Sequence, residues 1–239
     1  MDAIVESRVD CSTLRKINLR QPMVPQVYAA LRALIIDLTW KPGQIVAKDD
    51  VAEALGVSQS PVREALLKLE EDGLIVVVPR SRTVVSMIDV RHAMEAQFLR
   101  LSVEVEVVRT IAARKDAEAH FAELAALLKH QEIFAGHGAF AEFAASDNEF
   151  HLRLYRLAGV ERLWALVNAR RSHIDRLRHL DLPSRGKLET VLRDHAAILA
   201  ALGDGNAAKA EAAIRSHLAG TLGRAQHLKA KFPEYFDEE

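Results

Sequence analysis

Asp147 and His151 are four residues apart, the spacing that places two side chains on one face of a helix, one turn apart. A carboxylate and an imidazole buried together destabilise a fold unless a partner satisfies both groups. His195 and His217 lie on similar apolar stripes of later helices. The four side chains therefore predict a buried metal ion with one oxygen and three nitrogen ligands. The remaining residues on the face of Asp147 and His151 are apolar: Phe140, Phe143, Phe150, Leu154 and Ala158.

Oxygen and imidazole ligands without a thiolate suit a divalent first-row metal. Zinc is our first choice, with nickel, manganese or iron as alternatives. Four protein ligands close a tetrahedral site, whereas an octahedral site keeps open positions, and only an open site could bind an effector directly. The competing interpretation is that each histidine is a hydrogen-bonded core residue without a metal.

A second group of polar residues interrupts the apolar stripe of a helix expected over residues 89–114. Gln97, Arg100 and Glu104 lie on or beside that stripe. Arg100 and Glu104 could form an internal ion pair one turn apart that needs no ligand. Alternatively, Arg100 faces a cavity and binds a carboxylate through two parallel hydrogen bonds. We favour the second interpretation, with Gln97 and Glu104 in the same effector site. The apolar stripe itself contains Met94, Leu101, Val107 and Ile111.

Composition narrows the class of protein. Of the 239 residues 49% are hydrophobic but only 5% aromatic, which favours helices over strands. The single cysteine, Cys11, excludes a disulfide within one chain and fits a reducing cytoplasm. No apolar run is long enough to span a bilayer and no secretory signal is visible, so we expect a cytoplasmic protein with no membrane partner. The net charge of −1 leaves room for nucleic-acid binding by one small part of the chain.

Helical periodicity dominates the second half of the chain, with breaks at glycine and proline. About six helices of this length form an all-α bundle, which we expect to be the effector-binding and dimerisation domain over residues 88–239. The expected helices cover residues 89–114, 116–134, 138–158, 160–181, 186–203 and 206–230.

The first half has a different pattern. Residues 1–20 lack a sustained period and are expected to form a mobile tail. A helix then precedes two short helices that meet at Gly56, which can adopt the left-handed conformation of a tight turn. The β-branched runs 74–78 and 83–85 predict a two-stranded hairpin with a basic tip. Together these elements predict a winged helix-turn-helix over residues 21–87.

A helix-turn-helix places the start of its second helix in the major groove of DNA. The residues there are Ser58, Gln59, Ser60 and Arg63. A glutamine suits adenine and an arginine suits guanine, each through paired hydrogen bonds. Arg80 and Arg82 on the hairpin could contact phosphates or a minor groove. A helical domain can also contain such a turn by chance, but the following hairpin favours DNA binding.

The helix-turn-helix region contains a series of short motifs: Pro42-Gly43, Leu55-Gly56-Val57-Ser58, Pro61-Val62-Arg63-Glu64-Ala65-Leu66, Leu69-Glu70 and Gly73-Leu74. With these motifs the region resembles the GntR family of bacterial transcription regulators, and the all-α half resembles the FadR-type ligand-binding (FCD) domain. The resemblance covers nearly the whole chain after residue 20.

The resemblance implies a homodimer on a two-fold, double-stranded DNA operator and a small organic acid as effector. Asp147 and His151 match the D-x-x-x-F/H motif of the family, and His195 and His217 match its later histidines. It also implies that Arg100 is the anchor for the carboxylate of the effector.

The sequence departs from the family pattern at the DNA-contacting positions. Gln59 and Ser60 stand where the family usually has arginine and threonine, and Asp49 where it often has arginine. The wing lacks the common glycine near Ser81–Arg82. Because two cationic positions are lost, we expect fewer phosphate or guanine contacts and a different operator.

The function predicted from these features is that of a ligand-responsive transcription regulator and not of an enzyme. One alternative is a metal-dependent hydrolase with an appended winged helix. It would need a base beside the metal, yet no H-E-x-x-H motif is present and Glu149, the nearest acid, points off the Asp147–His151 face. The other alternative is an acyl-CoA-responsive regulator in which the polar cluster is structural and binds no metal.

Overall fold

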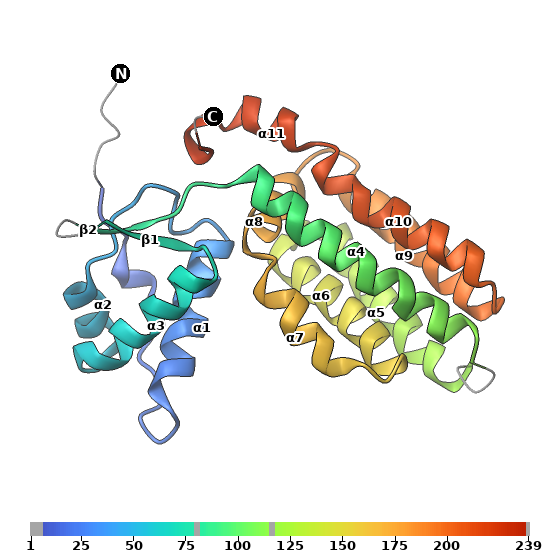
Figure 1. Ribbon diagram of the computed structural model, residues 1–239, viewed down its shortest axis with the longest axis horizontal. Coiled ribbons are helices and arrows are strands. Elements are labelled where there is room, and N and C mark those ends of the chain that lie inside the picture. The colour runs from blue at the N-terminus through green and yellow to red at the C-terminus, as the bar shows by residue number, and fades with distance from the viewer. Residues whose placement is uncertain (1–6, 79–81, 115–117, 238–239) are drawn as a thin grey trace. The chain divides into compact units, whose positions relative to one another are not determined.

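The computed structural model describes residues 7–78, 82–114 and 118–237, and its contacts divide the chain into two units (Figure 1). The first unit contains the described residues up to Val90 together with those from Lys229 onward. The second unit is Arg91–Leu228.

The first unit is a small helical domain with a hairpin. Gly56 ends the second of its helices with a φ of 70°, the left-handed conformation expected for the turn. The two strands are antiparallel, with Ile75 opposite Val85. Its elements are η1 (Cys11–Thr13), α1 (Met23–Ile36), α2 (Lys48–Leu55), α3 (Gln59–Glu71), β1 (Ile75–Val78) and β2 (Arg82–Val85). The expected winged helix-turn-helix arrangement is present.

The core of the first unit lies between α1, α2, α3 and β1, and α1 packs against α3. Apolar side chains recur every three or four residues along both of these helices and point towards one another. The fully buried members include Val27, Leu31, Ile35, Trp40, Val62 and Leu69. This core fixes α3 against α1 and leaves the start of α3 at the surface.

The N-terminal segment is part of this unit and is not a mobile tail over its described residues. The Val9 amide donates to the Ile45 carbonyl at 3.0 Å, and the Val9 side chain is buried. The Trp40 indole N–H donates to the Asp10 carbonyl at 3.2 Å. The prediction of mobility is therefore wrong for residues 7–18, because backbone pairing and one buried valine hold a stretch too short to show a period. Residues 1–6 lie outside the described residues.

The second unit is helical throughout its described residues. The helices α4 to α11 replace the six expected helices, because two of those are each broken into two. The helix expected over residues 160–181 is broken at Arg170 and Arg171, and the helix expected over residues 206–230 is broken at Gly223. The bounds are α4 (Val90–Ala112), α5 (Glu118–Gly136), α6 (Phe140–Leu157), α7 (Glu161–Ala169), α8 (Ser172–Asp181), α9 (Lys187–Gly203), α10 (Ala207–Leu222) and α11 (Ala225–Lys231).

The break between α7 and α8 has a side-chain cause. Arg171 is fully buried, and its guanidinium donates to Asn148 Oδ1 at 3.1 Å and to Asp175 Oδ1 at 2.9 Å. Helical periodicity does not predict this break, because no glycine or proline lies at Arg170 or Arg171.

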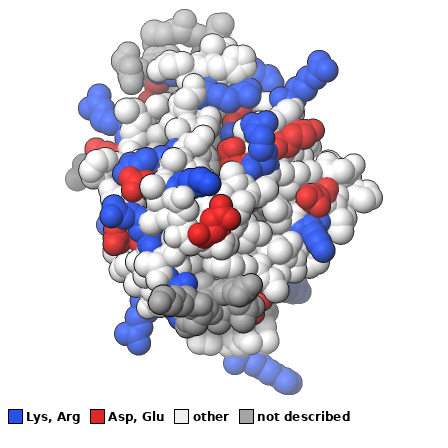
Figure 2. All heavy atoms as spheres, turned by 90° about the vertical axis from the view of Figure 1, so that its right-hand side faces the viewer, with Lys and Arg blue, Asp and Glu red and all other residues white. Residues whose placement is uncertain are grey.

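The core of the second unit lies between α4, α5, α6, α9 and α10, with α10 packed on α9 and α5 packed on α6 and α9. The mainly α-helical fold predicted from the sequence is thus confirmed. Among the described helices none is long and apolar enough to cross a bilayer. On the face shown in Figure 2, basic and acidic side chains are interspersed, as the near-zero net charge leads one to expect.

The C-terminal segment lies in the first unit and not in the second domain, where residues up to 239 were expected. After α11 come η2 (Pro233–Tyr235) and Phe236, whose side chain is 3% exposed. The Ile88 amide donates to the Tyr235 carbonyl at 2.8 Å. The segment therefore completes the fold of the unit that begins the chain.

Candidate metal centre and ligand cavity

The structure brings together the four predicted metal ligands from three helices. Asp147 and His151 lie on α6, His195 on α9 and His217 on α10. One ligand atom of each lies within 4.8 Å of the others. The Asp147, His151 and His195 side chains are fully buried, and that of His217 is 7% exposed.

The Nε2 atoms of the three imidazoles point to one spot. The Nε2 atoms of His151 and His217 are 3.1 Å apart, and those of His195 and His217 are 3.3 Å apart. Asp147 Oδ1 is 3.6 Å from His195 Nε2. The i, i+4 spacing on α6 and the packing of α10 against α9 are what produce this convergence.

Each imidazole has an acceptor beside its other nitrogen. His151 Nδ1 is 2.7 Å from Glu104 Oε2, and His195 Nδ1 is 2.8 Å from Gln131 Oε1. His217 Nδ1 lies 3.7 Å from Asp194 Oδ2. In His151 and His195 the acceptor at Nδ1 keeps the proton there and leaves the Nε2 lone pair free, as around histidines that bind metals.

The protonation states also suit a metal. Burial lowers the pKa of His151 to about 4, with a further contribution from the charge of Arg100. Burial and the neighbouring His217 lower the pKa of His195 well below its ordinary value. Burial alone would raise the pKa of Asp147, but Arg178 and the histidines outweigh it and lower that pKa. At neutral pH the group is two neutral imidazoles beside a carboxylate, the forms that coordinate cations.

These residues fit a divalent cation better than a hydrogen-bonded cluster. Three lone pairs that share one spot cannot all be satisfied by hydrogen bonds to one another, and Asp147 Oδ1 has no hydrogen-bond partner among the described residues. Metal–nitrogen bonds of about 2.1 Å separate two nitrogens by about 3.0 Å in octahedral and about 3.4 Å in tetrahedral geometry. The Nε2 separations of 3.1 and 3.3 Å lie within that interval.

A cavity of about 30 Å³ adjoins His217. Arg100 and Gln97 line it, whereas Glu104 is not among its lining residues. Glu104 is fully buried and its Oε1 accepts from Arg100 Nε at 2.6 Å, so both of its oxygens face residues of the site and neither faces the cavity. The internal Arg100–Glu104 ion pair considered above is therefore present, and Arg100 lines the cavity as well.

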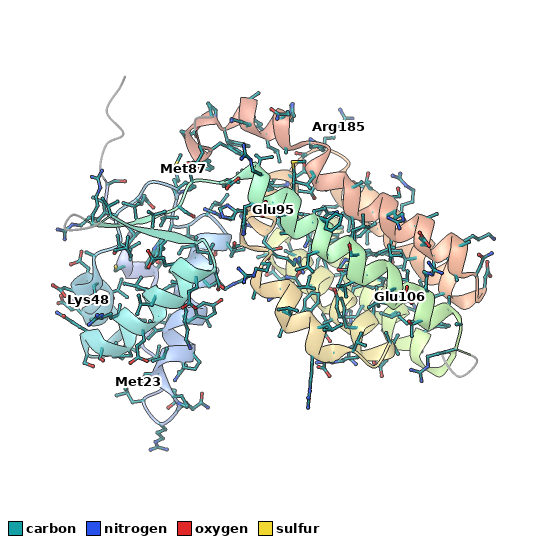
Figure 3. The ribbon with its side chains drawn as sticks, viewed as in Figure 1. Met23, Lys48, Met87, Glu95, Glu106 and Arg185 are labelled. Atoms are coloured by element: carbon teal, nitrogen blue, oxygen red, sulfur yellow. The ribbon has the colours of Figure 1, made fainter. Side chains whose placement is uncertain are left out.

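Gln97 and Arg100, which line the cavity, each keep one polar atom that could bind a ligand. Gln97 Nε2 donates to the Leu218 carbonyl at 2.6 Å, while its Oε1 has no hydrogen-bond partner among the described residues. Arg100 Nη2 is likewise without one. Glu95 and Glu106, labelled in Figure 3, lie on the exposed side of α4, opposite this polar face.

Sequence reasoning missed two cationic residues of the cavity. Arg178 on α8 forms an ion pair with Asp147 Oδ2, and Lys187 at the start of α9 also lines the cavity. Burial alone would lower the pKa of Arg178, but Asp147 and Asp175 raise it. The i, i+3 spacing of Asp175 and Arg178 indicates that the two side chains share one face of a helix. Because one unbroken helix was expected over residues 160–181, this spacing did not predict that Arg178 points inward.

The lining of the cavity is cationic. Arg100, Arg178 and Lys187 face it against one carboxylate, that of Asp194. A divalent metal at the neighbouring histidines would add further positive charge. The chemistry of the cavity therefore suits a small anion.

The predicted DNA-contacting residues that the structure describes are exposed on the first unit. Ser58 is the N-cap of α3, and Gln59, Ser60 and Arg63 follow it, all exposed. Gln59 Nε2 donates to Asp49 Oδ1 at 2.5 Å, so two of the departures from the family pattern contact each other. Arg82 is exposed at the start of β2. Arg80 lies outside the described residues.

Comparisons with known proteins match the two parts of the chain to two different protein families. The family of bacterial regulatory proteins named gntR matches residues 24–85, and the FCD domain matches residues 87–220. FCD domains are often metal-binding, and proteins of the GntR family bind DNA operators and commonly form dimers.

Curated relatives match over most of their length. An uncharacterized HTH-type transcriptional regulator of Streptomyces ambofaciens is 32% identical over 88% of this chain and 88% of its own. The HTH-type transcriptional repressor RspR of Escherichia coli is 28% identical over 94% of this chain and 98% of its own.

Solved structures share the fold. The McbR/YncC protein of Escherichia coli aligns with a TM-score of 0.74 at 21% identity, over 89% of this chain and 99% of its own. A GntR-type regulator from a Rhodococcus species aligns with a TM-score of 0.72 at 23% identity, over 85% of this chain and 97% of its own. The family predicted from the motifs is thus confirmed: the chain belongs to the GntR family of bacterial transcription regulators and carries a C-terminal FCD domain.

Proposed function

We propose that this chain is a cytoplasmic, ligand-responsive transcription regulator of the FadR type that senses a small carboxylate beside a bound divalent metal. It binds a two-fold DNA operator as a homodimer. The observation that carries the proposal is the convergence of three imidazole Nε2 atoms and a carboxylate next to a cationic cavity.

The metal ligands are Asp147, His151, His195 and His217, and zinc is the proposed ion, with nickel, manganese or iron as alternatives. When bound, the metal supplies a Lewis-acidic centre that attracts an anionic oxygen. Glu104 and Gln131 hold the imidazoles of His151 and His195 in the required orientation, and Asp194 lies 3.7 Å from His217 Nδ1.

Arg100 is the proposed anchor of the effector, because its Nη2 is unused and its position is fixed by Glu104. Gln97 offers a free carbonyl oxygen to a hydroxyl or amide of the effector. Glu104, first assigned to the effector, is better described as the residue that positions Arg100 and His151.

In the first unit, Ser58, Gln59, Ser60 and Arg63 are the proposed base-reading group, and the exposed Arg82 is a proposed phosphate contact. Arg80 keeps the same proposed role from its sequence position alone. The Gln59–Asp49 hydrogen bond holds the glutamine side chain in one orientation before DNA binds.

The two alternatives have less support. A hydrolase needs a free base beside the metal, but the Glu149 carboxylate accepts from Arg153 at 2.7 Å and from Arg156 at 3.2 Å. An acyl-CoA would need space for a long chain, which a cavity of about 30 Å³ does not provide.

Replacing one ligand tests the metal site. We expect the purified wild-type protein, loaded with Zn²⁺ and desalted, to carry about one metal ion per chain by plasma mass spectrometry. His217→Ala should lose the metal ion, because a side chain that only neighbours the ligands cannot replace the missing imidazole nitrogen. His227→Ala, an exposed histidine on α11, is the matched control and should retain the metal. Equal metal content in wild type and His217→Ala would contradict the site.

Replacing Arg100 tests the effector site. In Zn²⁺-loaded protein, Arg100→Ala should weaken the binding of small carboxylates about tenfold to a hundredfold, because a charge-assisted hydrogen bond is lost. Calorimetric titration with a panel of acids from acetate to succinate provides the measurement. Arg109→Ala, an exposed arginine on α4, should bind like wild type. Unchanged affinity in Arg100→Ala for every acid that binds would remove the anchor role.

Replacing Arg63 tests the DNA-binding surface. Arg63→Ala should weaken binding to DNA from upstream of the gene by about 1–3 kcal/mol at constant salt, because a contact to a base edge is lost. Lys68→Ala, exposed in the last turn of α3, should have little effect. Electrophoretic shift at several salt concentrations is the measurement. If wild type forms no sequence-preferring, salt-sensitive complex with or without metal, the regulator interpretation fails.

A further inference from the structure

We infer that the buried Asp181 carboxylate, with Lys187 and Arg224, relays the state of the ligand cavity to the DNA-binding unit through the C-terminal segment, residues 225–237. The inference rests on the proposed function, because it assumes that the cavity binds a ligand. Nothing in the motifs of the sequence points to these three residues.

Asp181 holds two cations from different elements. It is the last residue of α8 and its side chain is fully buried. Its Oδ2 lies 2.9 Å from Lys187 Nζ, and its Oδ1 accepts from Arg224 Nε at 2.9 Å. A buried carboxylate that loses one of two partners is left poorly satisfied, so a movement of either cation affects the other.

Lys187 connects this ion-pair cluster to the cavity. It is the first residue of α9, is 9% exposed and lines the cavity together with Arg100 and His217. Its Nζ lies 3.4 Å from the position that a Cβ on Gly220 would occupy. The glycine in α10 therefore leaves space for the ammonium group at the wall.

The cavity is smaller than the ligand it is proposed to bind. A volume of about 30 Å³ holds roughly two water molecules, which is less than a carboxylic acid requires. Entry of an acid must move part of the lining, which includes Lys187 and Thr190 from α9 and Gly220 and Thr221 from α10. Arg224 lies two residues after the end of α10, so a shift of α10 reaches the Asp181–Arg224 ion pair.

From Arg224 the chain leads into the first unit. Helix α11 begins at Ala225, and the division between the units falls within it, after Leu228. The segment ends with the Ile88–Tyr235 hydrogen bond and the buried Phe236. Ile88 follows Met87, labelled in Figure 3, in the linker between β2 and α4.

The segment is therefore anchored at both ends. Its beginning is held by an ion pair whose carboxylate also contacts a cavity residue, and its end is hydrogen-bonded to the linker that leaves the wing. A ligand that draws Lys187 away from Asp181 leaves the buried carboxylate with Arg224 as its remaining cation. This strengthens the Arg224 anchor, and so shifts the population in which the end is docked on Ile88.

Hydrogen exchange of the Ile88 amide in the full chain tests the relay without any ligand. Arg224→Gln should raise the exchange rate of this amide about tenfold, because the charge-assisted hydrogen bond that holds the segment is lost. Arg185→Gln, an exposed arginine labelled in Figure 3, is the matched control and should exchange like wild type. An Ile88 exchange rate in Arg224→Gln equal to that of wild type would overturn the relay.

DNA binding with and without a ligand tests the coupling, with acetate as the probe on Zn²⁺-loaded protein. We expect acetate to change the operator affinity of wild type and Arg185→Gln at least threefold, and to leave that of Arg224→Gln and Phe236→Ala unchanged although both still bind acetate by calorimetry. The same acetate response in Arg224→Gln as in wild type overturns the relay. If wild type binds no acetate, the result counts against acid sensing, and the Ile88 exchange alone decides the relay.

Discussion

The structure of the second unit depends on the meeting of three imidazole nitrogens and one carboxylate in the interior of the unit. Nitrogen lone pairs separated by 3.1 and 3.3 Å repel one another unless a positive charge lies between them. The acceptors beside the imidazoles favour that arrangement. Glu104, Gln131 and Asp194 each lie beside the Nδ1 atom of one histidine, and Arg178 pairs with Asp147. The proposed cation would complete this set and satisfy Asp147 Oδ1, which has no hydrogen-bond partner among the described residues.

The same arrangement explains why the ligand cavity lies where it does. His217 belongs both to the proposed metal site and to the cavity wall, and Arg100 reaches the cavity because Glu104 holds it there while also contacting His151. The proposed metal and the proposed effector would thus share their supporting residues. A regulator built in this way couples the two ligands, because each one orders side chains that the other needs.

Sequence reasoning succeeded where a local pattern determined the outcome. The i, i+4 pair of Asp147 and His151 required only a helix, and the turn at Gly56 required only a residue that tolerates positive φ. It did not find Arg178, because its orientation depends on a helix break caused by the buried Arg171 side chain. Nor did it place Val9 and Phe236 in the first unit, since each is one buried residue in an irregular segment whose partners lie far away in the chain. Local periodicity carries no information about such contacts.

Anomalous diffraction from crystals of the Zn²⁺-loaded protein, with data collected on both sides of the zinc absorption edge, tests the proposed metal centre without any substitution. We expect one anomalous peak within about 2.0–2.3 Å of the Nε2 atoms of His151, His195 and His217 and of an oxygen of Asp147. A fully loaded crystal without a peak between these four side chains, or with ordered water hydrogen-bonded to them in its place, would contradict it.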